Sequence, residues 1–356
     1  MLGSIVAYLG LAGHNQYFNL IAEVGFLYLM FLAGMEVDLK QITNSPKIVI
    51  QKSMLFLLLM MMFSIVFGLL FGLNTIVIVS MPLISIGLLA SLSRIYGKEE
   101  SWIRLAFIAG VLGEILSIAA LTVFDAAITT GFNIDLILKI SYLLLFIFVI
   151  YILYKMLHLL FWWYPELKSI LVPKMDTSAQ DIRLSISLFF ILIAVMLALE
   201  LELALGAFIA GIAISAFFHH EKQLEEKMSS LGFGFLVPLF FIHVGASFDL
   251  KALVLEGVVS GALLITVLMI ASRVLAAVLL KGISGAKDAL LIALSLSMPL
   301  TLLVAVATIG YETKLLDLLT YYQLILASIF EILISMTIIK VLQAKKRLPK
   351  NRKNPS

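Results

Sequence analysis

Glu114 is an acidic residue in the middle of a long apolar stretch, residues 102–130. If that stretch spans a bilayer, Glu114 lies near the membrane centre. A charged side chain there costs roughly 3 kcal/mol or more and therefore faces the protein interior or a cavity. A carboxylate removed from water favours its protonated form, whereas a nearby cation favours the charged form. Glu114 could therefore hold either a proton or a monovalent metal cation; a structural carboxylate paired with another helix is the alternative.

Arg273 is a second ionisable residue within an apolar stretch, and its guanidinium cannot lose its charge. It lies eight residues before Lys281, which is about 12 Å along a helix. Its side chain could extend to the cytoplasmic interface along its aliphatic stem. Otherwise it faces an acid in the core, for which Glu331 and Glu114 are the candidates. Glu331 is also near mid-membrane, either as a structural partner that balances Arg273 or as a second ion-linked carboxylate.

Two segments that contain proline interrupt apolar stretches near residues 80–87 and 295–301. Proline removes a helical hydrogen bond, and in lipid the freed carbonyl groups need another partner. Simple kinks would explain the prolines. Their symmetric placement favours two unwound crossings whose backbone dipoles coordinate an ion. The residues assigned to the crossings are Pro82, Ser85 and Gly87 in the first, and Ser297 and Pro299 in the second.

The composition indicates that these residues belong to a membrane protein. Of 356 residues, 62% are hydrophobic and 13% are charged, and the mean hydropathy is +1.12. The absence of cysteine excludes disulfides and thiolate metal sites. We predict an all-α polytopic protein that is not an enzyme and that needs neither a cofactor nor nucleic acid. Its helices, about twelve in number, are expected near 1–12, 20–38, 47–70, 73–94, 102–130, 134–163, 180–198, 203–218, 232–246, 252–280, 285–309 and 317–343.

Lys and Arg residues gather in alternate loops between these segments, as the positive-inside rule predicts. With the basic tail 344–356 in the cytoplasm, only Lys139, Lys251 and Lys314 fall in outer loops. We therefore predict an integral protein of a bacterial inner membrane with a cytoplasmic C-terminus. The tail is expected to attract anionic lipid.

The sequence also contains an internal repeat. Gly34-Met-Glu-Val-Asp38-Leu-Lys40 is echoed by Gly245-Ala-Ser-Phe-Asp249-Leu-Lys251, and each mid-membrane glutamate lies 32 residues beyond the proline of its half. These matches predict two inverted five-helix repeats, a common plan of secondary transporters. The repeats are residues 1–130 and 203–343, joined by linking helices in 131–202.

Three stretches resemble the monovalent cation:proton antiporter family, in particular its Kef-type and NapA-type branch. They are Ala22-Glu-Val-Gly-Phe-Leu-Tyr-Leu-Met-Phe-Leu-Ala-Gly-Met-Glu-Val-Asp38, Leu205-Gly-Ala-Phe-Ile-Ala-Gly-Ile-Ala-Ile-Ser215 and Pro238-Leu-Phe-Phe-Ile-His-Val-Gly245. The resemblance implies a core domain with two crossed, broken helices beside an ion-binding carboxylate, and a scaffold domain that forms homodimers. It places Glu114 where the family has its ion-binding aspartate and Ser85 in the first crossing. It also makes Arg273 the basic residue opposite the carboxylates.

The chain departs from this family in three respects. Gly113-Glu114 stands where relatives show Asp-Asp or Gln-Asp, and Pro299-Leu-Thr-Leu stands where they often carry Gly-Glu-Phe. The family's first helix is expected to be absent, as is the nucleotide-binding regulatory domain that Kef-type proteins append.

The residues and the resemblance together predict alternating-access exchange of Na⁺ or K⁺ for H⁺. Glu114 is expected to bind the cation and the proton in turn, and Ser85 with the unwound backbone to complete the oxygen ligands that hard cations prefer. One titrating carboxylate beside a permanently charged arginine predicts one-for-one, electroneutral exchange. Two alternatives stay open: a regulated K⁺ efflux system, and a degenerate transporter that acts as a membrane sensor or structural subunit.

Overall fold

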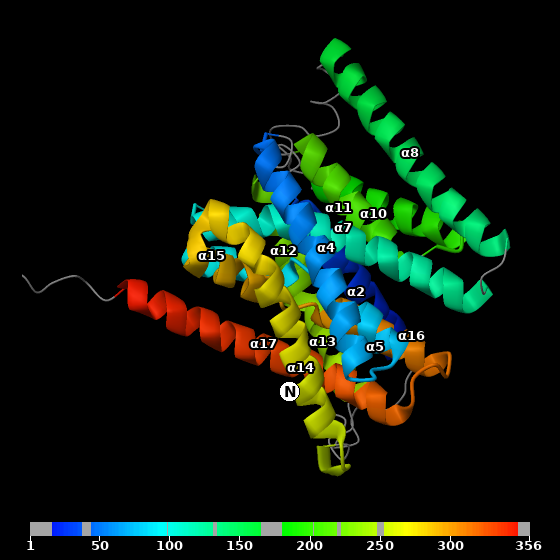
Figure 1. Ribbon diagram of the computed structural model, residues 1–356. Coiled ribbons are helices and arrows are strands. Elements are labelled where there is room, and N and C mark those ends of the chain that lie inside the picture. The colour runs from blue at the N-terminus through cyan, green and yellow to red at the C-terminus, as the bar shows by residue number, and fades with distance from the viewer. Residues whose placement is uncertain are drawn as a thin grey trace, which may run out of the picture. The chain divides into compact units, whose positions relative to one another are not determined.

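Every regular element in the described part of the computed structural model is a helix (Figure 1). The structure describes residues 16–37, 44–97, 99–130, 134–164, 180–201, 203–218, 222–247 and 253–347. The helices are α2 (Gln16–Met35), α4 (Lys47–Leu70), α5 (Thr75–Ser80), α6 (Gly87–Tyr96), α7 (Ser101–Thr130), α8 (Ile134–Trp163), α10 (Gln180–Ala198), α11 (Leu203–Phe218), α12 (Lys222–Leu231), η1 (Gly232–Leu236), α13 (Val237–Ser247), α14 (Val258–Ala276), η3 (Ala277–Leu280), α15 (Lys281–Ser295), α16 (Leu300–Glu312) and α17 (Leu318–Arg347).

Length and composition mark several of these helices as candidate membrane spans. Among the described residues, seven helical stretches are long and apolar enough to cross a membrane, and α11 and α16 contain shorter apolar helices. The predicted segments coincide with these helices to within a few residues wherever the structure describes them. The predicted fold class, an all-helical polytopic membrane protein with two broken helices, is therefore confirmed. The segment 1–12 and the acidic–basic ends of the repeated motif, 38–40 and 249–251, lie outside the described residues.

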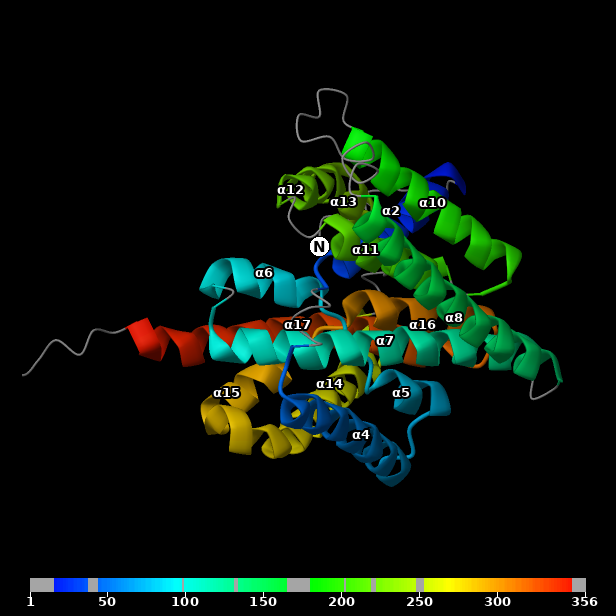
Figure 2. The same ribbon diagram turned by 90° about the horizontal axis from the view of Figure 1, so that it is seen from above.

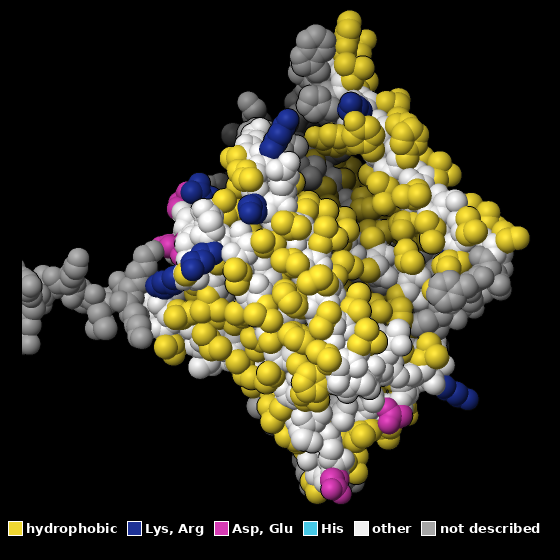
Figure 3. All heavy atoms as spheres, viewed as in Figure 1, with side chains coloured by type: hydrophobic (Ala, Val, Ile, Leu, Met, Phe, Trp, Pro, Cys, Tyr) yellow, Lys and Arg dark blue, Asp and Glu magenta, His cyan; other side chains and the backbone are white. Residues whose placement is uncertain are grey.

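Hydrophobic side chains are spread widely over the face drawn in Figure 3. On α4 and α8 many large apolar side chains are exposed, among them Leu58, Leu69, Leu70, Leu144, Leu145 and Phe148. Water would disfavour so much exposed apolar area, whereas the hydrocarbon of a bilayer covers it without cost. The surface thus agrees with the hydropathy of the helices in marking an integral membrane protein.

The chain forms two compact units that differ from its predicted repeats. The first unit combines residues 1–44 with 118–250, and the second combines 45–117 with 251–356. Each unit therefore takes helices from both halves of the sequence. The division into repeats 1–130 and 203–343 remains a prediction.

In the first unit, two glycines allow α2 and α11 to pack with their backbones in close contact. A Cβ atom at Gly34 would overlap the carbonyl oxygen of Phe208, and one at Gly211 would overlap that of Phe31. Small residues favour such close approach between membrane helices, where dispersion forces replace the hydrophobic effect. The glycine-rich sequence of α11 is thus explained by helix packing.

In the second unit, two helices are interrupted where the sequence predicted crossings. Helices α5 and α6 are separated by residues 81–86, and α15 and α16 by residues 296–299. α5 contacts α16 while α6 contacts α15, so the two broken helices pair half against half. Around them α14 packs against α17 and α4, and α4 and α14 lie side by side in both Figure 1 and Figure 2. This packing places both breaks inside the second unit.

Candidate functional site

The first break begins where Pro82 prevents α5 from continuing. Proline has no N–H and clashes with the preceding turn. The last helical bonds run from the amide of Met81 to the Val77 carbonyl at 3.0 Å and from the amide of Leu83 to the Ser80 carbonyl at 3.2 Å. Residues 81–86 are not helical, and α6 starts at Gly87. Ser85 therefore lies in the break as predicted, whereas Gly87 lies at its edge as the first residue of α6.

Two side chains of α7 accept hydrogen bonds from the backbone amides that the break leaves unpaired. The amide of Ile84 donates to the hydroxyl oxygen of Ser117 at 2.9 Å. The amide of Ile86 donates to Oε2 of Glu114 at 3.1 Å, and the hydroxyl of Ser85 is 3.4 Å from Oε1 of the same carboxylate. Because buried amides need acceptors, these bonds hold the unwound segment against α7.

Glycines on α7 bring the breaks close to the carboxylate. A Cβ at Gly113 would meet Ile84 at 2.6 Å. One at Gly110 would meet Ile86 at 2.7 Å and Leu296, in the second break, at 3.0 Å. Both broken helices therefore pack directly on the glycine face of α7, which also explains why glycine precedes Glu114.

The buried carboxylate of Glu114 can bind either a proton or a small cation. Its side chain is fully buried, with 0% exposed surface. Each carboxylate oxygen has a second lone pair beyond the hydrogen bond that it accepts, and this lone pair can take a proton or a cation. The carboxylate and the Ser85 hydroxyl offer the oxygen ligands that hard monovalent cations prefer. The geometry thus suits exchange of one small cation for another on a single carboxylate.

Arg273 is fully buried, and its partner is Glu331. Its Nη1 lies 2.7 Å from Oε1 of Glu331 and also donates to the carbonyl of Met269 at 3.1 Å. Its Nη2 donates to the carbonyl oxygen of Leu83 at 2.6 Å. Of the interpretations that the sequence left open, the structure supports a core ion pair and not an interfacial arginine. The Arg273 side chain thus connects the first break to α17.

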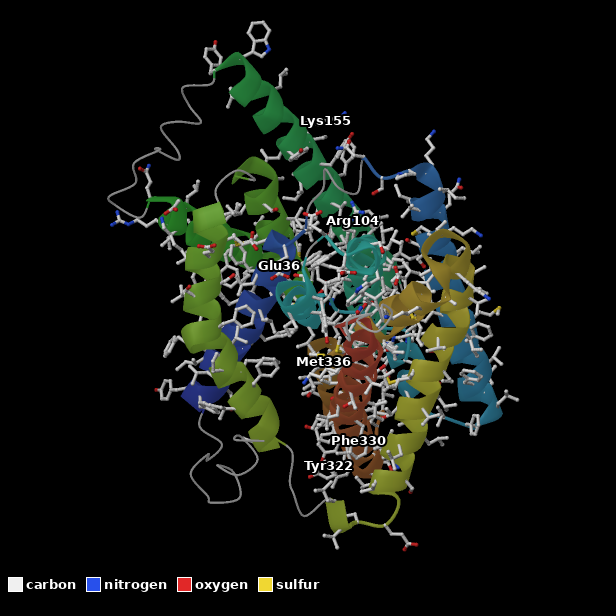
Figure 4. The ribbon with its side chains drawn as sticks, turned by 90° about the vertical axis from the view of Figure 1, so that its left-hand side faces the viewer. Glu36, Arg104, Lys155, Tyr322, Phe330 and Met336 are labelled. Atoms are coloured by element: carbon white, nitrogen blue, oxygen red, sulfur yellow. The ribbon has the colours of Figure 1, made fainter. Side chains whose placement is uncertain are left out.

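Glu331 lies on α17 between Phe330 and Met336, which are labelled in Figure 4. The hydroxyl of Ser297, from the second break, lies beside the Glu331 carboxylate but outside hydrogen-bond geometry. The second break therefore differs from the first, because its glutamate binds an arginine instead of backbone amides. The structure brings the predicted residues together as two neighbouring groups: Glu114 with Ser85 beside Pro82, and Arg273 with Glu331 near Ser297 and Pro299.

Ser117 is a site residue that the sequence did not single out. It lies three residues after Glu114, on the same face of α7. That spacing was available in the sequence. A serine in a membrane helix, however, usually donates to its own backbone, so its role as an acceptor shows only in the fold.

The sequence model of the family described as "Sodium/hydrogen exchanger, transmembrane" matches residues 1–345. The chain belongs to this family. The predicted resemblance is confirmed at that level, and the narrower assignment to the Kef-type and NapA-type branch stays a prediction.

Individual proteins also match the chain, over different lengths. A Na⁺/H⁺ antiporter of Enterococcus hirae is 26% identical over 346 residues, which cover 91% of this chain and 84% of that protein. YjbQ of Bacillus subtilis is 28% identical over 174 residues, which cover 48% of this chain. The match spans only 28% of the length of YjbQ.

A solved structure supports the same fold. The sodium proton antiporter MjNhaP1 from Methanocaldococcus jannaschii aligns with a TM-score of 0.63 and 16% identity, covering 97% of this chain and 89% of the other. At that identity the likeness shows a shared exchanger fold and nothing about the transported ion.

Proposed function

We propose that the protein is a secondary transporter that exchanges Na⁺ or K⁺ for H⁺ by alternating access. Glu114 binds the cation and the proton in turn, and Ser85 contributes a further oxygen ligand. The observation that carries this proposal is the fully buried Glu114 carboxylate, bound by the amide of Ile86 in a broken helix. The family match and the Na⁺/H⁺ antiporter activity named for the Enterococcus hirae relative support it.

The role of Glu114 is tested by purified protein in proteoliposomes that contain a pH-sensitive dye. Addition of Na⁺ or, separately, K⁺ outside acid-loaded vesicles is expected to drive protons out. Glu114→Gln keeps the size of the side chain but removes its negative charge and is expected to abolish this movement. Glu226→Gln, an exposed glutamate on α12, is the matched control and should retain it. Exchange that persists in Glu114→Gln would remove Glu114 from the mechanism.

The same preparation distinguishes the two cations. Proton movement with Na⁺ alone, with K⁺ alone or with both assigns the substrate directly. Saturation with cation concentration, together with a requirement for a counter-gradient, distinguishes exchange from a channel-like K⁺ efflux system. Absence of movement with either cation would favour a membrane sensor or structural subunit.

We further propose that the exchange is one-for-one and electroneutral. A single carboxylate holds one cation or one proton, so each cycle moves equal charge in both directions. When the pH is clamped on both sides, the final Na⁺ or K⁺ ratio across the vesicle membrane should not depend on an imposed membrane potential. A ratio that follows the potential would refute one-for-one exchange.

The orientation and oligomeric state are part of the proposal. The distribution of Lys and Arg supports a cytoplasmic C-terminus in a bacterial inner membrane, and the resemblance supports a homodimer in contact with membrane lipid. Because the sequence contains no cysteine, Ala344→Cys introduces a single thiol near the end of α17. A membrane-impermeant maleimide should label this thiol in inverted vesicles and not in intact cells. The reverse pattern would show that the C-terminus lies outside the cytoplasm. Light scattering of the detergent-solubilised protein reports the dimer.

A further inference from the structure

Three charged side chains are fully buried among the described residues of the second unit: Glu114, Arg273 and Glu331. Arg273 and Glu331 form an ion pair at 2.7 Å. Glu114 takes its hydrogen bonds from neutral groups, the amide of Ile86 and the hydroxyl of Ser85. The charges of the ion pair cancel, so Glu114 alone determines the net charge of this group.

The ion pair is poorly explained as a device for stability. Replacing a buried ion pair by apolar residues is often neutral or stabilising, because both charges must leave water. Moreover, in the part of the chain that the structure describes, neither Nε of Arg273 nor Oε2 of Glu331 has a hydrogen-bond partner. The buried hydroxyl groups of Ser297 and Ser335 also lack partners there. A pair retained for stability would be expected to satisfy these atoms, so the charge of the pair is the better explanation for its presence.

The charge count has a direct consequence for transport. With a proton or a monovalent cation on Glu114, the group of three residues is neutral; when Glu114 is empty, the group carries one negative charge. A net charge is costly to carry through the membrane interior. The two loaded forms can therefore change their orientation, whereas the empty form is held back.

We infer that Glu331 is the residue that makes exchange obligatory, because it cancels the positive charge of Arg273. This inference rests on the proposed function and assigns the coupling of that same site. Without the charge of Glu331, the empty group is neutral and the loaded group is positive. The empty form then returns freely, whereas both loaded forms carry the costly charge. Exchange needs two such charged crossings in each cycle but uptake of the cation alone needs only one, so uptake driven by an inside-negative potential is no longer masked by exchange.

Cation accumulation in proteoliposomes measures this coupling independently of the transport rate. The vesicles are buffered strongly at the same pH on both sides, and an inward gradient of the permeant anion thiocyanate sets a potential of ~100 mV, negative inside. Radioactive Na⁺ is the probe, or K⁺ if the first assay assigns it. Wild-type protein should equilibrate the cation without accumulating it. Glu331→Gln should accumulate it, up to about fifty-fold at ~100 mV.

Two further variants keep the test decisive. Glu331→Met has a similar side-chain length without polar groups, and it should also accumulate the cation if Glu331→Gln does not fold. The double variant Arg273→Gln/Glu331→Gln restores the net charge of the wild-type group. It should equilibrate the cation without accumulating it, even if its transport is slower. Glu256→Gln, an exposed glutamate of the second unit, is the matched control and should behave as wild type. A purely structural role of Glu331 would change the rate or the yield of these variants but not their coupling.

The outcomes separate the inference from the proposed function. If wild-type protein exchanges cations for protons and folded Glu331→Gln or Glu331→Met still only equilibrates the cation, the inference is overturned. Accumulation by the double variant would overturn it as well, because the charge count would then not control coupling. If wild-type protein exchanges neither Na⁺ nor K⁺ for protons, it is the proposed function that fails.

Discussion

The guanidinium of Arg273 donates a 2.6 Å hydrogen bond to the carbonyl oxygen of Leu83, which lies in the unwound segment between α5 and α6. Unwinding at the proline leaves this carbonyl without a helical hydrogen-bond partner, and a carbonyl inside a membrane protein then needs another donor. The same segment has its amides bound by Glu114 and Ser117 of α7. The break is therefore held through its amides by α7 and through a carbonyl by α14.

Arg273→Lys is expected to slow exchange while leaving its coupling intact. A lysine keeps the positive charge but lacks the planar guanidinium, whose two terminal nitrogens bind Leu83 and Glu331 at the same time. Loss of one hydrogen bond to a charged group is worth about 1.5–3 kcal/mol, so the initial rate of exchange should fall about tenfold or more. Arg104→Lys, an exposed position on α7, is the control for the same substitution. Equal rates in the two variants would show that the bond to Leu83 does not matter for transport.

Proline, glycine and hydropathy predicted most of what positions the site. Pro82 and Pro299 marked both helix breaks, because a ring without an N–H interrupts a helix whatever surrounds it. The burial of Glu114 was expected from its position in the middle of one apolar segment. These features depend on a single segment, so the sequence was sufficient for them.

The partners of these residues could not be predicted in the same way. Arg273 had two acids at a similar depth, and hydropathy does not reveal how each helix is rotated about its axis. Only the packing of α14 against α17 places Glu331 beside Arg273. Likewise, the hydroxyl of Ser117 accepts a bond from Ile84, which is 33 residues away in the sequence. The composition of the two units, each drawn from both halves, also depends on tertiary contacts.

Protons and transported cations are expected to compete for Glu114. On the acidic side, where the protonated form dominates, each unit by which the pH falls should raise the apparent KM for the cation by about tenfold. The maximal rate at saturating cation should change far less, because excess cation displaces the proton. Initial uptake rates at several external pH values, with the internal pH fixed, measure both quantities. A falling maximal rate with constant KM would place the proton on a different group.

Ser117→Ala is expected to destabilise the protein, although the residue carries no charge. The variant leaves the buried amide of Ile84 without its acceptor, which costs about 1–3 kcal/mol. Ser64→Ala is the matched control, since Ser64 is equally buried but donates only to the carbonyl of Met60 within α4. The free energy of unfolding in detergent should therefore fall clearly in the first variant and little in the second. Equal losses would mean that the bond to Ile84 does not stabilise the break.

Gly211→Ala is expected to separate α2 from α11. A Cβ at position 211 would overlap the carbonyl oxygen of Phe31 and would lie 2.7 Å from the amide nitrogen of Met35. Backbone atoms cannot rotate away as a side chain can, so the helices must move apart, which typically costs about 1–3 kcal/mol. Gly234→Ala is the control within the same unit, because a Cβ there would meet nothing within 4 Å. Thermal unfolding in detergent should show a lower midpoint for Gly211→Ala than for the wild type. The midpoint of Gly234→Ala should stay close to that of the wild type, since its free energy of unfolding should change by no more than about 0.5 kcal/mol. Similar midpoints for the two variants would show that α2 and α11 can accommodate a methyl group and that the glycine face is not required for their packing.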